Sequence, residues 1–194
     1  MGVLSDKFGV PPFSVLDSKQ GYWIDRKKEW NELGIKSDLG RIENINSLPN
    51  ATNRPKSLGT YVDDEGKSKG FDKVASVSIF DPVLTELSYK WFCPKRGRIL
   101  DPFTGGSVRG VVASQFGFRY TGFDINQRQI DANYENLTEL KFPIAKPNWV
   151  CGDAEDVKKL TNGSYDMIFS CPPYHDLEIY GKDPRDLSNM SYPK

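Results

Sequence analysis

Residues 98–110 read RILDPFTGGSVRG, and this short stretch determines which fold the rest of the sequence is expected to adopt. The apolar residues at its start predict a buried strand that ends at Asp101. The Gly105-Gly106 pair that follows allows a tight turn and a close approach of the backbone to a bound molecule. The next residues predict a helix with valines on its inner face, ended by Gly117. A strand, a glycine turn and a helix in this order are typical of a ligand-binding unit of a parallel sheet.

The sequence beyond this stretch continues to alternate between strand and helix. Further strands are predicted at residues 118–125, 148–153 and 165–170, with helices between them at residues 126–140 and 154–160. Intervals of this length are typical of βαβ units with right-handed crossovers. We therefore predict an α/β protein with a Rossmann-like parallel sheet that carries helices on both faces.

The composition divides the chain into an N-terminal extension, residues 1–75, and a domain that carries the site, residues 76–194. The extension is rich in charged and turn-forming residues, and its residues 57–70 have the composition of an exposed loop. A short amphipathic helix is predicted within it, with Trp23 and Trp30 on one face. These two indoles could stack on nucleic-acid bases, but indoles in this arrangement more commonly dock a helix onto its domain.

The overall composition excludes several classes of protein. Lys plus Arg and Asp plus Glu number 26 each, so any contact with a polyanion must be local, as at residues 25–28 or 94–98. Such basic runs are also typical of solvated faces. One His and three Cys without C-x-x-C spacing provide no metal motif and indicate a reducing compartment. No apolar stretch is long enough for a signal peptide or a membrane span, so we expect a cytoplasmic protein without metal.

Three of the predicted strands end in an aspartate: Asp101, Asp124 and Asp153. Ligands of open parallel sheets bind at the carboxyl ends of the strands, so these side chains are expected to share one site. Taken singly, each aspartate is also typical of a helix cap or a turn. The residues around Gly105 lack the glycine spacing of dinucleotide sites and of P-loops.

The positions of the three acids indicate which ligand they suit. Asp101 would repel a pyrophosphate but could hold an ammonium group, Asp124 could accept hydrogen bonds from ribose hydroxyls, and Asp153 could meet an adenine edge. A ligand with a ribose and a cationic end is therefore expected. S-adenosylmethionine (SAM) fits this description better than NAD does.

The fourth predicted strand is followed by an unusually stiff turn, FSCPPYHD at residues 169–176. Met167, Ile168 and Phe169 predict a buried strand, which two adjacent prolines must end abruptly because prolines lack an N–H. A fixed turn with Tyr174 at its tip suits the placement of a reacting group.

Two motifs resemble those of a known enzyme family. DPFTGGS at residues 101–107 is similar to the D-P-F-x-G-x-G motif, and CPPY at residues 171–174 to the [DNS]-P-P-[YFW] motif, of amino-methylating DNA methyltransferases. Residues 8–23 and 78–94 resemble segments that precede the glycine turn in phage and prophage DNA methylases. The resemblance extends over nearly the whole chain, from about residue 8 to about residue 190.

The resemblance implies a SAM-methyltransferase fold and methyl transfer from SAM to N6 of adenine or N4 of cytosine in double-stranded DNA. Tyr174 would then stack on a base flipped out of the duplex. The residues implied on the acceptor side are Ser170, Cys171, Pro172, Pro173 and Tyr174. Those implied on the cofactor side are Phe80, Asp101, Pro102, Phe103, Thr104, Gly105, Gly106, Ser107, Asp124, Ile125, Asp153 and Ala154.

Two residues depart from the family pattern. Ser107 replaces a glycine but is small enough to fit. Cys171 replaces the Asp, Asn or Ser that in the family accepts a hydrogen bond from the target amine. That hydrogen bond leaves the lone pair of the amine nitrogen available for attack on the methyl group. A thiol is a weak acceptor, so the reaction is slower, Ser170 assists, or the acceptor differs. Cys171 could also be a nucleophile, as in C5-cytosine methylation, although that cysteine follows the prolines, or a structural residue without a chemical role.

The length of the chain adds a further expectation. The family's sheet has seven strands, whereas this sequence ends soon after the fourth, so we expect a C-terminally incomplete domain with an exposed edge. A second polypeptide or a homodimer partner could complete the sheet. A DNA amino-methyltransferase, a same-fold enzyme acting on RNA or protein, and a non-catalytic or partner-dependent fragment all stay open. An NAD-dependent oxidoreductase is disfavoured by Asp101 and by the missing third glycine.

Overall fold

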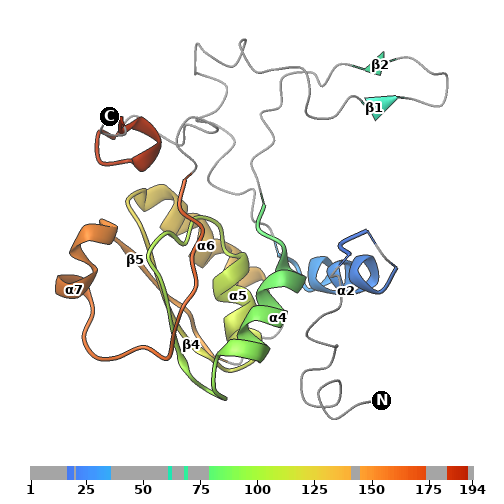
Figure 1. The fold of residues 1–194 in the computed structure, drawn as a ribbon, viewed down its shortest axis with the longest axis horizontal. Helices are drawn as coiled ribbons and strands as arrows, with labels where there is room; N and C mark the ends of the chain where they lie inside the picture. Colours follow the sequence, from blue (N-terminus) through green and yellow to red (C-terminus); the bar gives the residue numbers. More distant parts are fainter. Residues whose placement is uncertain are drawn as a thin grey trace.

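A four-stranded parallel sheet forms the centre of the computed structural model (Figure 1). Its strands lie in the order β5-β4-β3-β6, so the chain builds outward from β3 through β4 to β5 and then returns to the other side of β3. This confirms the predicted α/β fold and places the switch in direction between β3 and β6. The strands are β3 (Arg98–Asp101), β4 (Arg119–Asp124), β5 (Asn148–Cys151) and β6 (Met167–Ile168). The structure describes residues 17–19, 21–35, 61–62, 68–69, 79–140, 145–173 and 183–191.

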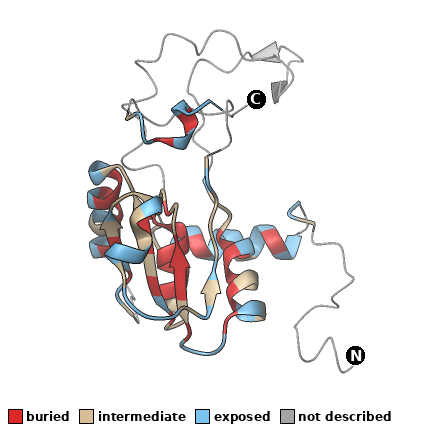
Figure 2. Cartoon of the chain, turned by 60° about the vertical axis from the view of Figure 1, so that its left-hand side comes forward, coloured by how far each residue is buried: buried red, intermediate tan, exposed pale blue. Residues whose placement is uncertain are grey.

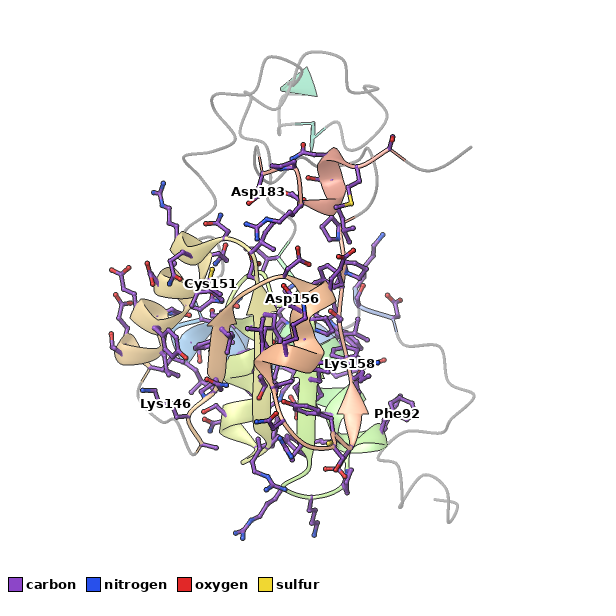
Figure 3. All side chains as sticks on the ribbon, turned by 90° about the vertical axis from the view of Figure 1, so that its left-hand side faces the viewer. Phe92, Lys146, Cys151, Asp156, Lys158 and Asp183 are labelled. Carbon is purple, nitrogen blue, oxygen red and sulfur yellow. The ribbon has the colours of Figure 1, made fainter. Side chains whose placement is uncertain are left out.

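Helices cover both faces of the sheet, as predicted. Trp149 of β5 lies against Gly110 of α5 and against Tyr134 of α6, which places both helices on one face. Leu160 of α7 lies against Gly152 on the other face, and α7 is in front of the sheet in Figure 3. The helices are α4 (Pro82–Phe92), α5 (Val108–Gln115), α6 (Gln127–Glu139) and α7 (Val157–Leu160), with short 3₁₀ turns η2 (Ala154–Asp156) and η3 (Leu187–Asn189).

The core lies between the sheet and helices α4, α5 and α6 (Figure 2). The inner face of α5 is formed by Val108, Val111 and Val112, all buried as the sequence predicted. Gly117 follows the end of α5 with a φ of 73°, a conformation that glycine adopts without strain. The predicted helix ending is therefore confirmed. None of the helices within the described ranges is long and apolar enough to span a bilayer.

The prediction of a buried fourth strand is confirmed only in part, because Met167 and Phe169 pack against the core whereas Ile168 does not. β6 is two residues long, it pairs with β3, and Ile168 is 68% exposed. The reason is topological, because β6 lies at the end of the strand order and its outward-facing residues therefore lack a covering layer within the described part of the chain. An apolar run alone cannot distinguish such an edge strand from a central one.

The N-terminal extension also differs in part from the expectation. Within residues 57–70, predicted as a loop, β1 (Tyr61–Val62) pairs antiparallel with β2 (Ser68–Lys69). The predicted amphipathic helix is α2 (Gly21–Glu32), and it packs against α4. Helix α2 thus contacts the domain directly, while the division at residue 75 stays an interpretation.

Two tryptophans dock α2 onto the start of α4, which confirms docking as their role. Trp23 and Trp30 are buried, and their indole N–H groups donate to Asp81 at 3.2 Å and to Glu86 at 2.8 Å. Asp81 also caps α4 by accepting from the backbone of Val83.

Charged groups on both helices stabilise this contact. Arg26 and Lys90 form ion pairs with Glu86 at 2.8 and 2.6 Å. Burial opposes ionisation of Glu86, but its hydrogen bonds from Arg26, Lys90 and Trp30 outweigh that effect and hold its pKa below the ordinary value. An ionised Glu86 therefore joins the two helices.

Glu86→Gln is expected to lower the free energy of unfolding at neutral pH by about 2 kcal/mol, because a charged acceptor is lost. The pKa of Glu86 is lower in the folded chain than its ordinary value of 4.5, so its contribution is complete above that value and is lost as the pH falls through the folded-state pKa. Denaturant titrations of both proteins from neutral to acidic pH measure this. The difference should shrink on acidification; Glu135→Gln, at an exposed position of α6, is the matched control.

Candidate active site

The carboxyl ends of β3 and β6 bring two predicted turns together. The glycine turn at residues 101–107 follows β3, and the Cys-Pro-Pro turn at residues 171–173 follows β6, which is its direct neighbour in the sheet. Figure 3 shows this edge uppermost, with Cys151 at the upper end of β5 and Lys146, which precedes β5, at the lower end. The two turns therefore meet where the strand order reverses, the usual ligand position in such sheets.

A buried carboxylate joins the two turns. Asp101 has no exposed surface, and one of its oxygens accepts from the hydroxyl of Ser170 at 2.7 Å and from the N–H of Phe103 at 3.2 Å. The Phe103 N–H also lies 3.1 Å from the Ser170 hydroxyl oxygen. The residue before the Cys-Pro-Pro turn is thus bonded directly to the backbone of the glycine turn.

The other oxygen of Asp101 is held by two side chains from neighbouring elements. Arg109 on α5 donates its Nε–H at 2.6 Å, and the hydroxyl of Tyr120 on β4 donates at 2.6 Å. Because the Tyr120 proton is used in this bond, the hydroxyl of Thr104, 2.7 Å away, donates to Tyr120. Burial, followed by the charge of Asp101, raises the pKa of Tyr120 well above its ordinary value, so this donor stays protonated.

Arg109 holds the glycine turn as well as the carboxylate. Its Nη2 donates to the backbone carbonyls of Phe103 and Thr104, and its guanidinium lies 4.7 Å from the ring centre of Phe80. Burial opposes the charge of Arg109, but the adjacent Asp101 outweighs burial and raises its pKa above the ordinary value. Arg109 therefore stays charged and forms an ion pair with Asp101 beneath the turn.

The role predicted for Asp101 needs correction. The sequence suggested that its carboxylate could hold the ammonium group of a ligand, but both oxygens are bonded within the chain and neither is exposed. Asp101 positions the turn and is not available for direct contact with a ligand in this structure. Arg109 was missed, although a charged residue between the valines of the inner face of α5 was a visible signal in the sequence.

The backbone of the glycine turn is held from two further sides. Gly105 has a φ of 49°, and its N–H donates to Asp124 at 3.1 Å, so the end of β4 lies beside the turn. Asn133 on α6 donates to the carbonyl of Gly105 at 2.7 Å, and the hydroxyl of Ser107 donates to Asn136 at 2.7 Å. Asp124 is therefore placed next to the turn, as a ribose-binding acid would require, and that role stays a prediction.

The end of β5 completes the same edge. Asp153 caps η2 by accepting from the N–H of Glu155 at 2.9 Å, and the Cys151 thiol lies 3.5 Å from the carbonyl of Ile125. Burial, followed by the charge of Asp124, raises the pKa of the Cys151 thiol, while Arg185 acts in the opposite direction. In Figure 3 the segment that contains Asp183 lies above Cys151, so residues 183–191 lie over this edge.

The predicted acceptor residues are described in part. Ser170, Cys171 and Pro173 are half-buried and Pro172 is exposed, while Tyr174 lies outside the described residues. No cluster of metal-binding side chains occurs among the residues that the structure describes. Of the two basic runs, residues 94–98 lead into the start of β3, at the end opposite to this edge. In the other run, Arg26 and Lys27 form ion pairs with Glu86 and Asp81.

Arg109→Met is expected to lower the free energy of unfolding by about 3–5 kcal/mol, because it leaves the carboxylate of Asp101 buried without its cation. Arg119→Met is the matched control, since Arg119 is exposed and should change stability by about 0.5 kcal/mol or less. Guanidinium titrations monitored by tryptophan fluorescence measure both. Equal effects of the two substitutions would contradict the role given to the buried pair.

The residues around the glycine turn fit SAM by their chemistry. Close backbone approach is possible at Gly105-Gly106, a carboxylate that can accept from ribose hydroxyls stands at the end of β4, and half-buried Ile125 and Ala154 lie beyond the ends of β4 and β5. Comparison with curated proteins and with solved structures found no match for this chain. Residues 103–189, somewhat less than half of the chain, match the family model described as a methyltransferase domain. The match indicates a SAM-dependent methyltransferase domain, and SAM is the methyl donor of that family.

Proposed function

We propose that this protein transfers a methyl group from SAM to the exocyclic amine of adenine (N6) or cytosine (N4) in DNA. One observation carries the proposal: the glycine turn and the Cys-Pro-Pro turn are bonded to each other through Ser170, Phe103 and Asp101. A stiff turn after the fourth strand, held beside the cofactor turn, suits the placement of an amine next to a methyl donor.

On the donor side, SAM supplies an electrophilic methyl group on a sulfonium centre. The residues of this chain would bind and orient it: the Gly105-Gly106 backbone by close approach, Asp124 by accepting hydrogen bonds from ribose hydroxyls, and Asp153 at the adenine edge. Asp101 acts indirectly, because its carboxylate fixes the backbone of the turn.

On the acceptor side, Pro172 and Pro173 restrict the backbone so that its carbonyl groups can accept from the target amine. The hydroxyl of Ser170 is occupied, since it donates to Asp101 and accepts from Phe103. Ser170 is therefore better suited to positioning the turn than to accepting a hydrogen bond from the amine. The thiol of Cys171, the first residue of the turn, is then the side chain left to accept a hydrogen bond from the amine. Because a thiol is a weak acceptor, methyl transfer is expected to be slow.

Calorimetric titration with SAM tests the donor side. The wild-type chain should bind saturably, and Asp124→Ala should weaken binding about tenfold or more, because it removes a charged acceptor. Asp131→Ala, at an exposed position of α6, should leave the dissociation constant unchanged. Absence of binding by a folded wild-type chain, or equal binding by the Asp124 variant, would contradict the proposed donor site.

The acceptor is tested with methyl-labelled SAM and equal amounts of unmethylated double-stranded DNA, RNA and protein. Label should appear in DNA as N6-methyladenine or N4-methylcytosine after digestion and chromatography. Cys171→Asp should raise the turnover rate about tenfold, because a carboxylate is a much stronger acceptor than a thiol. Label in RNA or protein alone would favour the same-fold alternative, and 5-methylcytosine would favour Cys171 as a nucleophile.

The DNA partner, the protein partner and the cytoplasmic location that the sequence led us to expect remain proposals. Double-stranded DNA is the partner that the proposed reaction requires. A second polypeptide or a second copy of the chain could pair with the outer edge of β6, which no other strand of the described ranges occupies and where Ile168 is exposed. A cytoplasmic location fits the absence of disulfides among the described cysteines.

A further inference from the structure

We propose that Ser170 and the buried Asp101–Arg109 pair form a positioning link that fixes the acceptor turn relative to the cofactor turn. Ser170 is the residue at which the two turns join, and Arg109 acts on it through Asp101. The naming of the turns as cofactor and acceptor sides rests on the proposed function, whereas the mechanical link rests on the contacts alone.

The first step of the argument is the geometry at Ser170. Its hydroxyl donates to Asp101 at 2.7 Å and lies 3.1 Å from the N–H of Phe103. Ser170 directly precedes Cys171, so a hydroxyl bonded in both directions restrains the start of the Cys-Pro-Pro turn. The backbone N–H of Phe169 also donates to Leu100 at 3.0 Å, which aligns the two chain segments just before the link.

The second step is that Asp101 is itself immobilised from the opposite side. Arg109 and Tyr120 hold the second carboxylate oxygen at 2.6 Å each, and they come from α5 and β4. Arg109 also holds the carbonyls of Phe103 and Thr104. A substitution at Arg109 is therefore expected to loosen Ser170 as well, because both residues bond the carboxylate of Asp101, although they do not bond each other.

The third step is packing above the ion pair. Phe80 places its ring against the guanidinium of Arg109 at 4.7 Å and edge-on to Phe169 at 5.6 Å. Phe169 directly precedes Ser170 in the sequence, so Phe80 packs on Arg109 and on the neighbour of Ser170. Asp101 and Arg109 are both buried, which strengthens the interactions of the pair.

The alkylation rate of Cys171 tests the link without any ligand. Peptide-resolved mass spectrometry follows alkylation by iodoacetamide in the wild-type chain and its variants, with buried Cys93 as an internal reference. Ser170→Ala should raise the Cys171 rate about tenfold relative to Cys93, because it removes the bonds that hold the turn. Arg109→Lys should raise the same ratio, since Lys lacks the planar fork that bonds Asp101 and both carbonyls at once.

Two further variants sharpen the test. Ser170→Thr keeps the hydroxyl and should therefore show the wild-type ratio of Cys171 to Cys93 alkylation rates. Tyr134→Phe removes a hydroxyl that is bonded to the backbone of Trp149, outside the link, and should leave the ratio unchanged. A wild-type ratio in Ser170→Ala, or an equal rise at Cys93, would overturn the proposal, because the first shows no restraint and the second shows general loosening.

Turnover separates positioning from general damage. Ser170→Ala should lower kcat about tenfold while the dissociation constant for SAM changes less than about threefold. Equal loss in both quantities would overturn a positioning role. The alkylation result does not depend on SAM or DNA, so a chain that fails to bind SAM would refute the proposed function and still give a definite answer about the link.

Discussion

The buried carboxylate of Asp101 is the constraint on which the arrangement of the site depends. A carboxylate with no exposed surface must be compensated within the chain, and here compensation comes from α5, β4, the glycine turn and the strand end at Ser170. Each of these bonds fixes one element relative to β3. Satisfying one charge therefore positions four parts of the structure at the carboxyl edge of the sheet.

A second, uncharged set of bonds supports the glycine turn from below. Gln129, Asn133 and Asn136 are buried on α6 at a spacing that places them along one side of the helix. Asn133 reaches the carbonyl of Gly105, and Asn136 accepts from Ser107 and donates to the carbonyl of Gly34 after α2. Asn136 thereby connects Gly34, just after α2, to Ser107 at the end of the glycine turn.

Much of the fold could be predicted because its signals are local. The helix start at Asp81-Pro82, the glycine turn and the end of α5 at Gly117 each depend on residues a few positions apart. The exposure of β6 could not be predicted, since it depends on the position of a strand in the sheet and not on its own apolar residues. Local pattern also favoured a loop where β1 and β2 pair.

The candidate site shows the same division. The positions of Asp101, Asp124 and Asp153 at strand ends were predictable from spacing, but their partners were not. Asp101 suggested a ligand contact because a carboxylate in front of the glycine turn could hold an ammonium group. The structure shows instead that Arg109 and Tyr120, distant from each other in the sequence, occupy the same oxygen. Which aspartate is paired within the chain depends on tertiary contacts, and the spacing of residues along the sequence does not reveal these contacts.

The bond between Ser170 and Asp101 has a consequence for the order in which the chain folds. Its partners are 69 residues apart, whereas Arg109 and Asp101 are separated by 8. Closing the longer loop costs more chain entropy, so the ion pair and the glycine turn can form from local sequence before β6 arrives. The glycine turn can then form early in folding, and the Cys-Pro-Pro turn joins it later, on a surface that already exists.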